Sequence, residues 1–128
     1  MTIAEDCLFA AVLLYLLTLA PVKALGRREF DNANPRNPKF YRSPMRARVL
    51  GAHNNGIETF PFFAAAVLLA EFRSAPQAWI DGLAVSFLLA RMVYVWAYIN
   101  GRATLRSTLW SVGLAANTAI FFLPAFRR

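Results

Sequence analysis

The sequence predicts an all-α integral membrane protein whose four transmembrane helices form an antiparallel bundle in one domain, residues 1–128. Of the 128 residues, 58% are hydrophobic and only 16% are charged, and the mean hydropathy is +0.41. A soluble domain usually has about 45–50% apolar and about 25% charged residues. Because so small a chain exposes much of its surface, lipid is the expected solvent. A water-soluble enzyme and a disordered chain are disfavoured, as is a disulfide scaffold, since Cys7 is the only cysteine.

Of the four predicted transmembrane segments, the first and the fourth are the least polar. Residues 7–22 carry no charge, and we expect a helix over about 3–23, with Glu5, Asp6 and Lys23 at the membrane interfaces. A signal peptide opens with a positive region, whereas this segment opens with two acidic residues, so we expect the helix to be retained. Residues 107–126 are also free of charge and predict a helix over about 105–126.

The second and third segments predict helices over about 49–71 and 77–99, although both carry polar residues. The third contains Asp81 near its start and Arg91 in its second half. Backbone polar groups in lipid must be satisfied within their own segment, which favours helices over strands for all four spans. The connection 24–48 is rich in proline and asparagine and is typical of a turn-rich loop.

Lysine and arginine are distributed unevenly over the loops. Ten of the 14 lie in or beside the connections 24–48 and 100–106, whereas the opposite side has only Arg73, Arg127 and Arg128. Cytoplasmic loops carry such an excess of positive charge. We therefore expect the basic loops in the cytoplasm and both termini outside. This orientation accounts for the net charge of +7, so nucleic-acid binding is disfavoured.

The second segment concentrates polar side chains at membrane depth. Ionisable groups there cost at least about 2.5–3.5 kcal/mol on insertion scales and usually face the bundle interior or a wet cavity. Asn54 and Asn55 precede Glu58 by four and three residues, so the three can share one helix face. Pro61 follows and should kink the helix or free a backbone carbonyl near this cluster.

The third segment places a cation and two phenols on one stripe. Arg91, Tyr94 and Tyr98 are spaced i, i+3 and i+7, which puts them on one side of a helix. The simplest arrangement pairs Glu58 with Arg91, so that neither charge is left alone in lipid. Two purely structural alternatives remain. The polar pair could serve only to hold helices together, and the tyrosines could belong to an interfacial aromatic belt.

An anion pocket facing the cytoplasm explains these residues jointly. Arg106 and Ser107 begin the fourth predicted helix, where unpaired N–H groups and the positive end of the helix dipole favour anions. Arg106 could hold a carboxylate there or lower the pKa of a thiol, or it could extend to lipid headgroups as an interfacial residue. No metal site is expected, because His53 is the only histidine and Cys7 lies at the opposite end of another span.

Several segments resemble one known family. Residues 48–63, RVLGAHNNGIETFPFF, resemble the signature of the MAPEG family, the membrane-associated proteins in eicosanoid and glutathione metabolism. The family pattern there is a basic residue, then asparagine, then glutamate three residues later, then proline. Residues 27–30 (RREF), 90–98 (ARMVYVWAY) and 105–107 (LRS) resemble their family counterparts. The resemblance spans nearly the whole chain and suggests a short bacterial member in the inner membrane.

The resemblance implies a homotrimer of four-helix bundles that binds glutathione between neighbouring subunits on the cytoplasmic side. Carried over by position, Arg106 would stabilise the glutathione thiolate, with Tyr98 as a hydrogen-bond donor and Ser107 as a lesser candidate. Arg91 would be mainly structural. The implied glutathione-binding residues are Arg27, Asn55, Glu58, Tyr94 and Tyr98.

Three positions depart from the family pattern. Gly51 stands where family enzymes have an arginine, Asn54 where some have a second arginine, and Trp110 where several have a tyrosine whose ring borders the thiol. An arginine can hold a carboxylate through two parallel hydrogen bonds. Its replacement by glycine therefore favours weaker glutathione binding, or another thiol or anion as the ligand.

Three functional hypotheses follow. The first is a glutathione-dependent transferase or peroxidase that takes glutathione from the cytoplasm and a lipophilic electrophile from the bilayer. The second is a small proton-coupled drug exporter in which Glu58 titrates, although a nearby Arg91 would repel cationic drugs. The third is a non-catalytic member of the family, which Gly51 supports.

Overall fold

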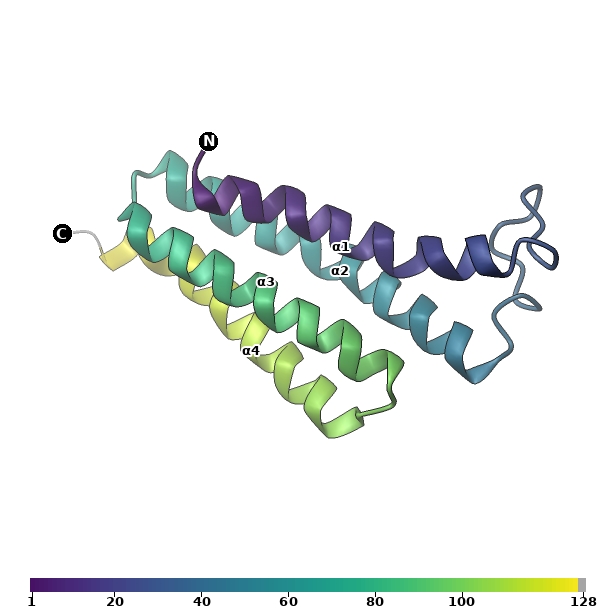
Figure 1. Ribbon diagram of the computed structural model, residues 1–128. Helices are drawn as coiled ribbons and strands as arrows, with labels where there is room; N and C mark the ends of the chain where they lie inside the picture. The colour runs from purple at the N-terminus through teal and green to yellow at the C-terminus, as the bar shows by residue number, and fades with distance from the viewer. Residues whose placement is uncertain (127–128) are drawn as a thin grey trace.

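Four α-helices and one short 3-10 helix make up the regular structure of residues 1–126, the part of the chain that the computed structural model describes. Successive α-helices run in opposite directions (Figure 1). This confirms the all-α prediction, whereas Arg127 and Arg128, which the charge pattern placed outside the membrane, lie beyond the described residues. The elements are α1 (Ile3–Leu25), α2 (Pro44–Phe72), α3 (Gln77–Ile99), α4 (Ala103–Phe122) and η1 (Leu123–Phe126).

Local sequence determines where α1 and α2 begin. The Thr2 hydroxyl accepts the Glu5 N–H at 3.1 Å while the Glu5 carboxylate accepts the Thr2 N–H at 2.7 Å, which forms a capping box. The Ser43 hydroxyl accepts the Arg46 N–H at 3.3 Å, and Pro44 is the first helical residue of α2. The prediction that this helix starts near residue 49 was therefore wrong, because a capping serine and a proline extend it toward the loop.

Three of the four predicted spans have the length and apolar composition to cross a membrane: α1, α3 and residues 103–126. Polar residues in the first half of α2 exclude it from this group. Its 29 residues nevertheless give it a length of about 43 Å, which exceeds the roughly 30 Å of the hydrocarbon layer. Pro61 does not end the helix, since α2 continues through it to Phe72.

The helices associate as two pairs that meet at one end. α1 packs on α2 and α3, while α4 packs on α3 and α2. The two pairs lie close together near the N-terminus and diverge toward the connection between α1 and α2 (Figure 1). The main apolar cluster lies at the closed end, where alanines allow the helices to approach and the Phe63 and Phe87 rings stack 4.1 Å apart.

Polar contacts also hold the closed end together. The Thr2 hydroxyl donates to the Glu71 carboxylate at 2.6 Å, and the Ala4 N–H donates to Asp81 at 2.9 Å. The Gln77 amide donates to both of these carboxylates, at 3.1 and 2.9 Å. Asp81 lies inside a predicted span, and its carboxylate accepts hydrogen bonds from the first turn of α1 and from the first residue of its own helix, α3.

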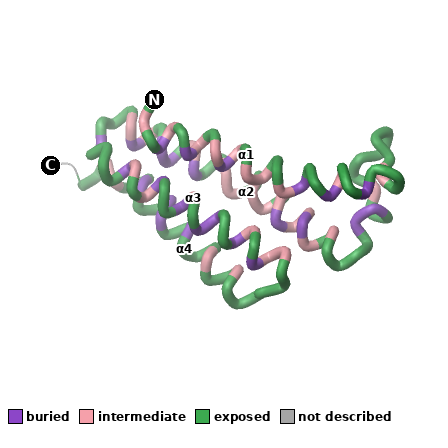
Figure 2. The backbone as a smooth tube through the Cα atoms, in the orientation of Figure 1, coloured by how far each residue is buried: buried purple, intermediate pink, exposed green. Residues whose placement is uncertain are grey.

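The outer surface of the bundle is apolar. Exposed and partly exposed residues run along the length of every α-helix (Figure 2), and large apolar side chains are among them. Phe9 and Leu17 are both 63% exposed and Leu89 is 56% exposed. So much apolar surface suits contact with lipid or with another apolar surface, and it suits water poorly.

The connection between α1 and α2 folds back on the helices through aromatic residues. Phe40 and Tyr41 are buried in a second, smaller apolar cluster with Leu19 and Val49. The Arg46 guanidinium lies over the Phe40 ring, 4.3 Å from its centroid, and donates to the Glu29 carboxylate at 2.6 Å. This hydrogen bond lowers the pKa of Glu29, whereas burial raises the pKa of Tyr41. Arg46, a residue of the first turn of α2, thus uses its positive charge to hold the connection in place.

The close contact between α1 and α2 at Gly56 gives a testable prediction. A Cβ at position 56 would lie 2.6 Å from Cβ of Tyr15, an atom fixed to the backbone of α1. We expect Gly56→Ala to lower the free energy of unfolding by about 1–3 kcal/mol, because the two helices must separate. Denaturant unfolding in detergent, followed by helical circular dichroism, measures this change.

Gly82→Ala is the matched control, since a Cβ at that helical position meets nothing within 4 Å. Its stability should stay the same or rise by up to about 1 kcal/mol, because alanine is the better helix former. Equal effects of the two substitutions would contradict the close packing of α1 on α2.

Candidate functional site

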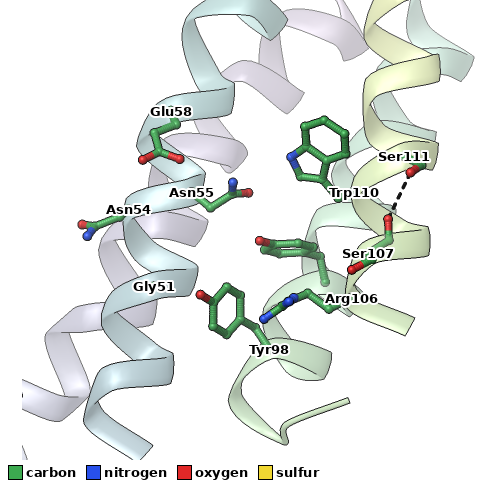
Figure 3. Close-up of a pocket in the computed structure, with 10 residues that line it drawn as sticks. Gly51, Asn54, Asn55, Glu58, Tyr98, Arg106, Ser107, Trp110 and Ser111 are labelled. Carbon is green, nitrogen blue, oxygen red and sulfur yellow. Dashed lines mark hydrogen bonds between the residues drawn. The ribbon is translucent and has the colours of Figure 1, made fainter. Parts of the chain in front are cut away.

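A polar cleft of about 560 Å³ lies between α2, α3 and α4, on the side of the bundle where the helix pairs diverge. Its wall brings together residues that the sequence places more than 50 positions apart (Figure 3). Six of the sequence-predicted residues line it: Asn55, Glu58, Tyr94, Tyr98, Arg106 and Ser107.

Two tyrosines of α3, each next to a guanidinium group, form one wall of the cleft. The Arg91 guanidinium lies 4.0 Å from the centroid of the Tyr94 ring, and the Arg106 guanidinium lies 4.7 Å from the centroid of the Tyr98 ring. The two rings pack edge to face, with their centroids 5.8 Å apart. Each ring thus presents a face to a cation, an arrangement that stabilises the cation by about 0.5–2 kcal/mol.

Arg91 pairs with Asn55, which corrects the predicted ion pair with Glu58. The guanidinium, only 4% exposed, donates from Nη1 to Oδ1 of Asn55 at 2.8 Å. Within residues 1–126, the Glu58 carboxylate makes no ion pair or hydrogen bond. The physical reason is that Glu58 is exposed at the wall of an open polar cleft and needs no buried partner, while the buried cation obtains an amide oxygen and an aromatic face.

The bond to Arg91 also determines how Asn55 faces the cleft. A guanidinium has only donors, so the asparagine must present its carbonyl oxygen to it. The Asn55 amide nitrogen is then left to donate elsewhere, and the side chain points from α2 toward Trp110 on the far side of the cleft (Figure 3). Asn54 also lines the cleft, but its side chain is exposed and has no hydrogen-bond partner comparable to Arg91 within residues 1–126.

Gly51 explains how Tyr98 fits against α2. A Cβ at position 51 would collide with the Tyr98 hydroxyl and would lie 2.7 Å from the ring carbon that bears it. The absence of a side chain on α2 therefore leaves room for the phenol. An arginine at position 51 is incompatible with this position of Tyr98, so the loss of that guanidinium is linked to the placement of the tyrosine hydroxyl.

The start of α4 supplies Arg106, although the prediction of unpaired N–H groups at this residue was wrong. α4 begins at Ala103, and the Arg106 N–H already donates to the Arg102 carbonyl at 2.9 Å. The unpaired N–H groups of the first turn precede Arg106. Its side chain nevertheless lies in the cleft beside Tyr98, rather than extending along the membrane interface (Figure 3).

Two further residues of α4 line the cleft. Ser111, which the sequence did not single out, donates from its hydroxyl to the Ser107 carbonyl at 3.1 Å (Figure 3). Trp110 borders the same space and is 42% exposed. Ser107 and Ser111 lie one turn apart on α4, and that spacing was the only signal in the sequence that could have placed Ser111 beside Ser107.

Arg27 and His53 lie away from the cleft. Arg27 is exposed in the turn that follows α1 and does not contribute to the wall of this space. His53 connects α2 to α1, because its Nδ1 is 2.6 Å from the Tyr15 carbonyl and its ring packs edge to face with the Tyr15 ring.

Comparison with known protein families shows to which family the chain belongs. The MAPEG family model matches residues 5–126, which includes every residue of the cleft and all four α-helices except the first two residues of α1. The chain belongs to the MAPEG family. No curated protein matches the sequence significantly. Membership of this family, together with three apolar helices of sufficient length, makes the chain an integral membrane protein.

The hydrogen bond between Asn55 and Arg91 predicts unequal effects of two neighbouring substitutions. Asn55→Ala should lower the free energy of unfolding by about 1.5–3 kcal/mol, because a buried charged donor loses its acceptor. Asn54→Ala removes an exposed amide from the same helix and should change stability by less than about 0.5 kcal/mol. Unfolding of the two variants in the same detergent tests this, and equal losses would contradict the assigned role of Asn55.

The contact between Gly51 and Tyr98 predicts coupling between them. Gly51→Ala should destabilise the protein by about 1 kcal/mol, because the phenol must move. In a Tyr98→Ala background the same substitution should cost little, which gives a coupling energy of about 1 kcal/mol in a double-mutant cycle. Additive effects of the two changes would show that the hydroxyl does not occupy this place.

Proposed function

We propose that this MAPEG protein binds glutathione in the polar cleft and uses its thiolate against lipophilic electrophiles. The observation that carries the proposal is the position of Arg106, whose guanidinium lies over the Tyr98 ring inside the cleft. Family membership supports a reaction in glutathione metabolism, and the chemistry of the cleft wall fits the ligand as follows.

The charges of the cleft complement those of glutathione. The tripeptide carries two carboxylates and one ammonium group besides its thiol. The Arg106 guanidinium and the free amide nitrogen of Asn55 can donate to carboxylates, as can the hydroxyl of Tyr94 or Tyr98. The Glu58 carboxylate, which has no partner within residues 1–126, can accept from the ammonium group. Gly51 removes one strong carboxylate contact, so we expect weaker binding than an arginine at this position would give.

Arg106 would make the thiol reactive. An ordinary cysteine thiol has a pKa of about 8.5, and a nearby guanidinium favours the thiolate. The Tyr98 ring lies beside that guanidinium, and its hydroxyl would donate to the sulfur. The thiolate then either forms a carbon–sulfur bond as the leaving group departs from the electrophile, or reduces a hydroperoxide to an alcohol, in which case two thiols become a disulfide and water is released.

The orientation and assembly of the protein belong to the same proposal. We place the cleft, the connection 26–43 with the helix ends that flank it, and the start of α4 on the cytoplasmic side, because residues 23–48 and 102–106 carry ten of the 14 lysines and arginines. α2 would complete the fourth span, with its polar residues facing the cleft. Arg27 lies outside the cleft of its own subunit, so it can contact glutathione only if a neighbouring copy packs against this face, as in a homotrimer.

The drug-exporter hypothesis receives less support. In an exporter Glu58 would face cationic drugs, yet Arg106 lines the same cleft and Arg91 lies directly behind Asn55. Two guanidinium groups so close to the carboxylate would repel a cation. MAPEG membership favours the glutathione reaction over this alternative.

Thiolate formation tests the proposed function. Adding glutathione to the purified protein in detergent should produce the ultraviolet absorbance of a thiolate, and the protein should conjugate glutathione to a chlorinated nitrobenzene. Arg106→Gln should abolish the absorbance and slow conjugation by about 100-fold, because it removes the charge that stabilises the sulfur anion.

Arg102→Gln is the control, since Arg102 is exposed at the start of α4 and its side chain makes no capping hydrogen bond there. It should retain both signals. If the unmodified protein gives neither thiolate absorbance nor conjugation, and glutathione does not raise its melting temperature, the protein is a non-catalytic MAPEG member and the proposal fails.

A further inference from the structure

A second cavity, of about 580 Å³, lies between the end of α1, the connection that follows it and the first half of α2. The polar cleft shares only the exposed Asn54 with it, so the two spaces are separate. None of the residues that we propose to bind glutathione lines this cavity. Its volume lies within the range of small-molecule sites, about 300–1,000 Å³.

The charged side chains on the wall of the cavity are both cations. Lys23 and Arg36 line it, and no aspartate or glutamate does. Neither cation forms an ion pair within residues 1–126. The two acidic residues of the connection are engaged elsewhere, Glu29 with Arg46 and Asp31 with a backbone N–H. The wall therefore offers unneutralised positive charge, which favours an anionic ligand.

The cavity lies where apolar sequence gives way to basic sequence. Lys23 is in the last turn of α1 and directly follows the uncharged residues 7–22. Leu19, one turn earlier, is also on the wall, as are Leu50 and Ile57 of α2. At the end of a membrane-spanning helix, a lysine lies at the level of the lipid headgroups, and the apolar residues before it lie at the level of the acyl chains. The wall thus extends over both levels.

Hydrogen bonds hold the polar part of the wall in place. The hydroxyl of the buried Tyr41 donates to the Pro35 carbonyl at 3.1 Å, and Pro35 directly precedes Arg36. On the opposite wall, Nδ1 of His53 donates to the Tyr15 carbonyl at 2.6 Å, since a carbonyl oxygen can only accept. A wall that is already ordered spends less of its binding energy on immobilising side chains.

We propose that this cavity binds the headgroup of an anionic phospholipid such as phosphatidylglycerol. The phosphate lies with Lys23 and Arg36, and the first carbons of the acyl chains lie along the apolar part of the wall. A zwitterionic headgroup fits less well, because its ammonium group would meet cations and no carboxylate. A free phosphate ion would use the cations alone and leave the apolar part of the wall in water.

The proposed lipid agrees with the proposed orientation of the protein, since the cytoplasmic leaflet is the one that carries anionic lipids. The inference goes beyond the proposed function and does not rest on it. Binding of a lipid in this cavity requires neither glutathione nor Arg106, and it can be measured without either.

Native mass spectrometry of the detergent-solubilised protein tests the inference, because it counts the lipids that are bound. Phosphatidylglycerol and phosphatidylcholine with identical acyl chains are titrated separately. Arg36→Gln removes one cation from the wall. We expect it to weaken binding of phosphatidylglycerol about fivefold, the effect of one basic residue beside an anionic lipid surface. Binding of phosphatidylcholine should be weaker in the unmodified protein and should not change in the variant.

Arg42→Gln is the matched control. It makes the same change of charge in the same connection, but Arg42 is exposed and does not line the cavity. It should weaken binding of phosphatidylglycerol by less than about twofold, because solvent and salt screen its charge. Equal losses in the two variants would overturn the inference, since the lipid would then follow net charge and not the cavity.

Ile57→Trp provides a second variant, which keeps both cations. Ile57 lines the cavity and is 47% exposed, so a larger ring at this position can occupy the cavity with little effect on the core. It should weaken binding of phosphatidylglycerol at least as much as Arg36→Gln does. Unchanged binding in this variant would place the lipid elsewhere on the protein and overturn the inference.

Two competitors distinguish the other possible occupants. Inorganic phosphate in large excess should not displace phosphatidylglycerol, and neither should glutathione. Displacement by phosphate would assign the cavity to a free anion, and displacement by glutathione would make it part of a glutathione site, so either result overturns the inference. Loss of lipid selectivity with intact thiolate formation would refute the lipid site alone, and the reverse result would refute the glutathione reaction alone.

Discussion

Arg91 places a cation inside a membrane bundle, and the way that cation is held determines the geometry of the cleft. An arginine within a span costs at least about 2.5–3.5 kcal/mol on insertion scales, so its surroundings must compensate. Here the compensation comes from one amide oxygen, that of Asn55, and from the face of the Tyr94 ring. Because both partners also line the cleft, satisfying the buried charge fixes the orientation of an amide and a phenol at the site.

The burial of Arg91 also distinguishes a polar residue with a structural role from polar residues whose charges are accessible in the cleft. Arg91 is buried behind the wall, whereas Arg106 and Glu58 lie at the wall with their charges accessible. A membrane protein can keep ionisable groups available in this way only where a wet or ligand-filled space adjoins them. The divergence of the two helix pairs provides that space, since the main apolar core fills only the opposite end of the bundle.

Much of this arrangement could be predicted from periodicity. The spacing of Arg91, Tyr94 and Tyr98 placed them on one face of a helix, and the helix bounds of α3 were predicted at 77–99, as observed. That Arg91 pairs with Asn55 and not with Glu58 could not be predicted. The two residues lie one turn apart on α2, and a long arginine side chain can reach either. Which one it contacts depends on the relative axial position of α2 and α3. The burial of Asn117, which is 2% exposed, could not be predicted either, because nothing in the uncharged fourth span indicates which of its polar residues face the bundle interior.

The contacts at the two ends of the bundle differ in kind, and this difference has a mechanical consequence. At the closed end Thr2, Glu71, Gln77 and Asp81 connect three helices, and the apolar core lies beneath them. At the other end α2 and α4 are separated by the cleft. The two helix pairs are therefore joined firmly at the closed end and are held together less tightly at the end that carries the cleft. A small anion bound in the cleft would contact α2 and α4 together. It would therefore restrict their relative motion most at the end of the bundle where the protein's own packing restricts it least.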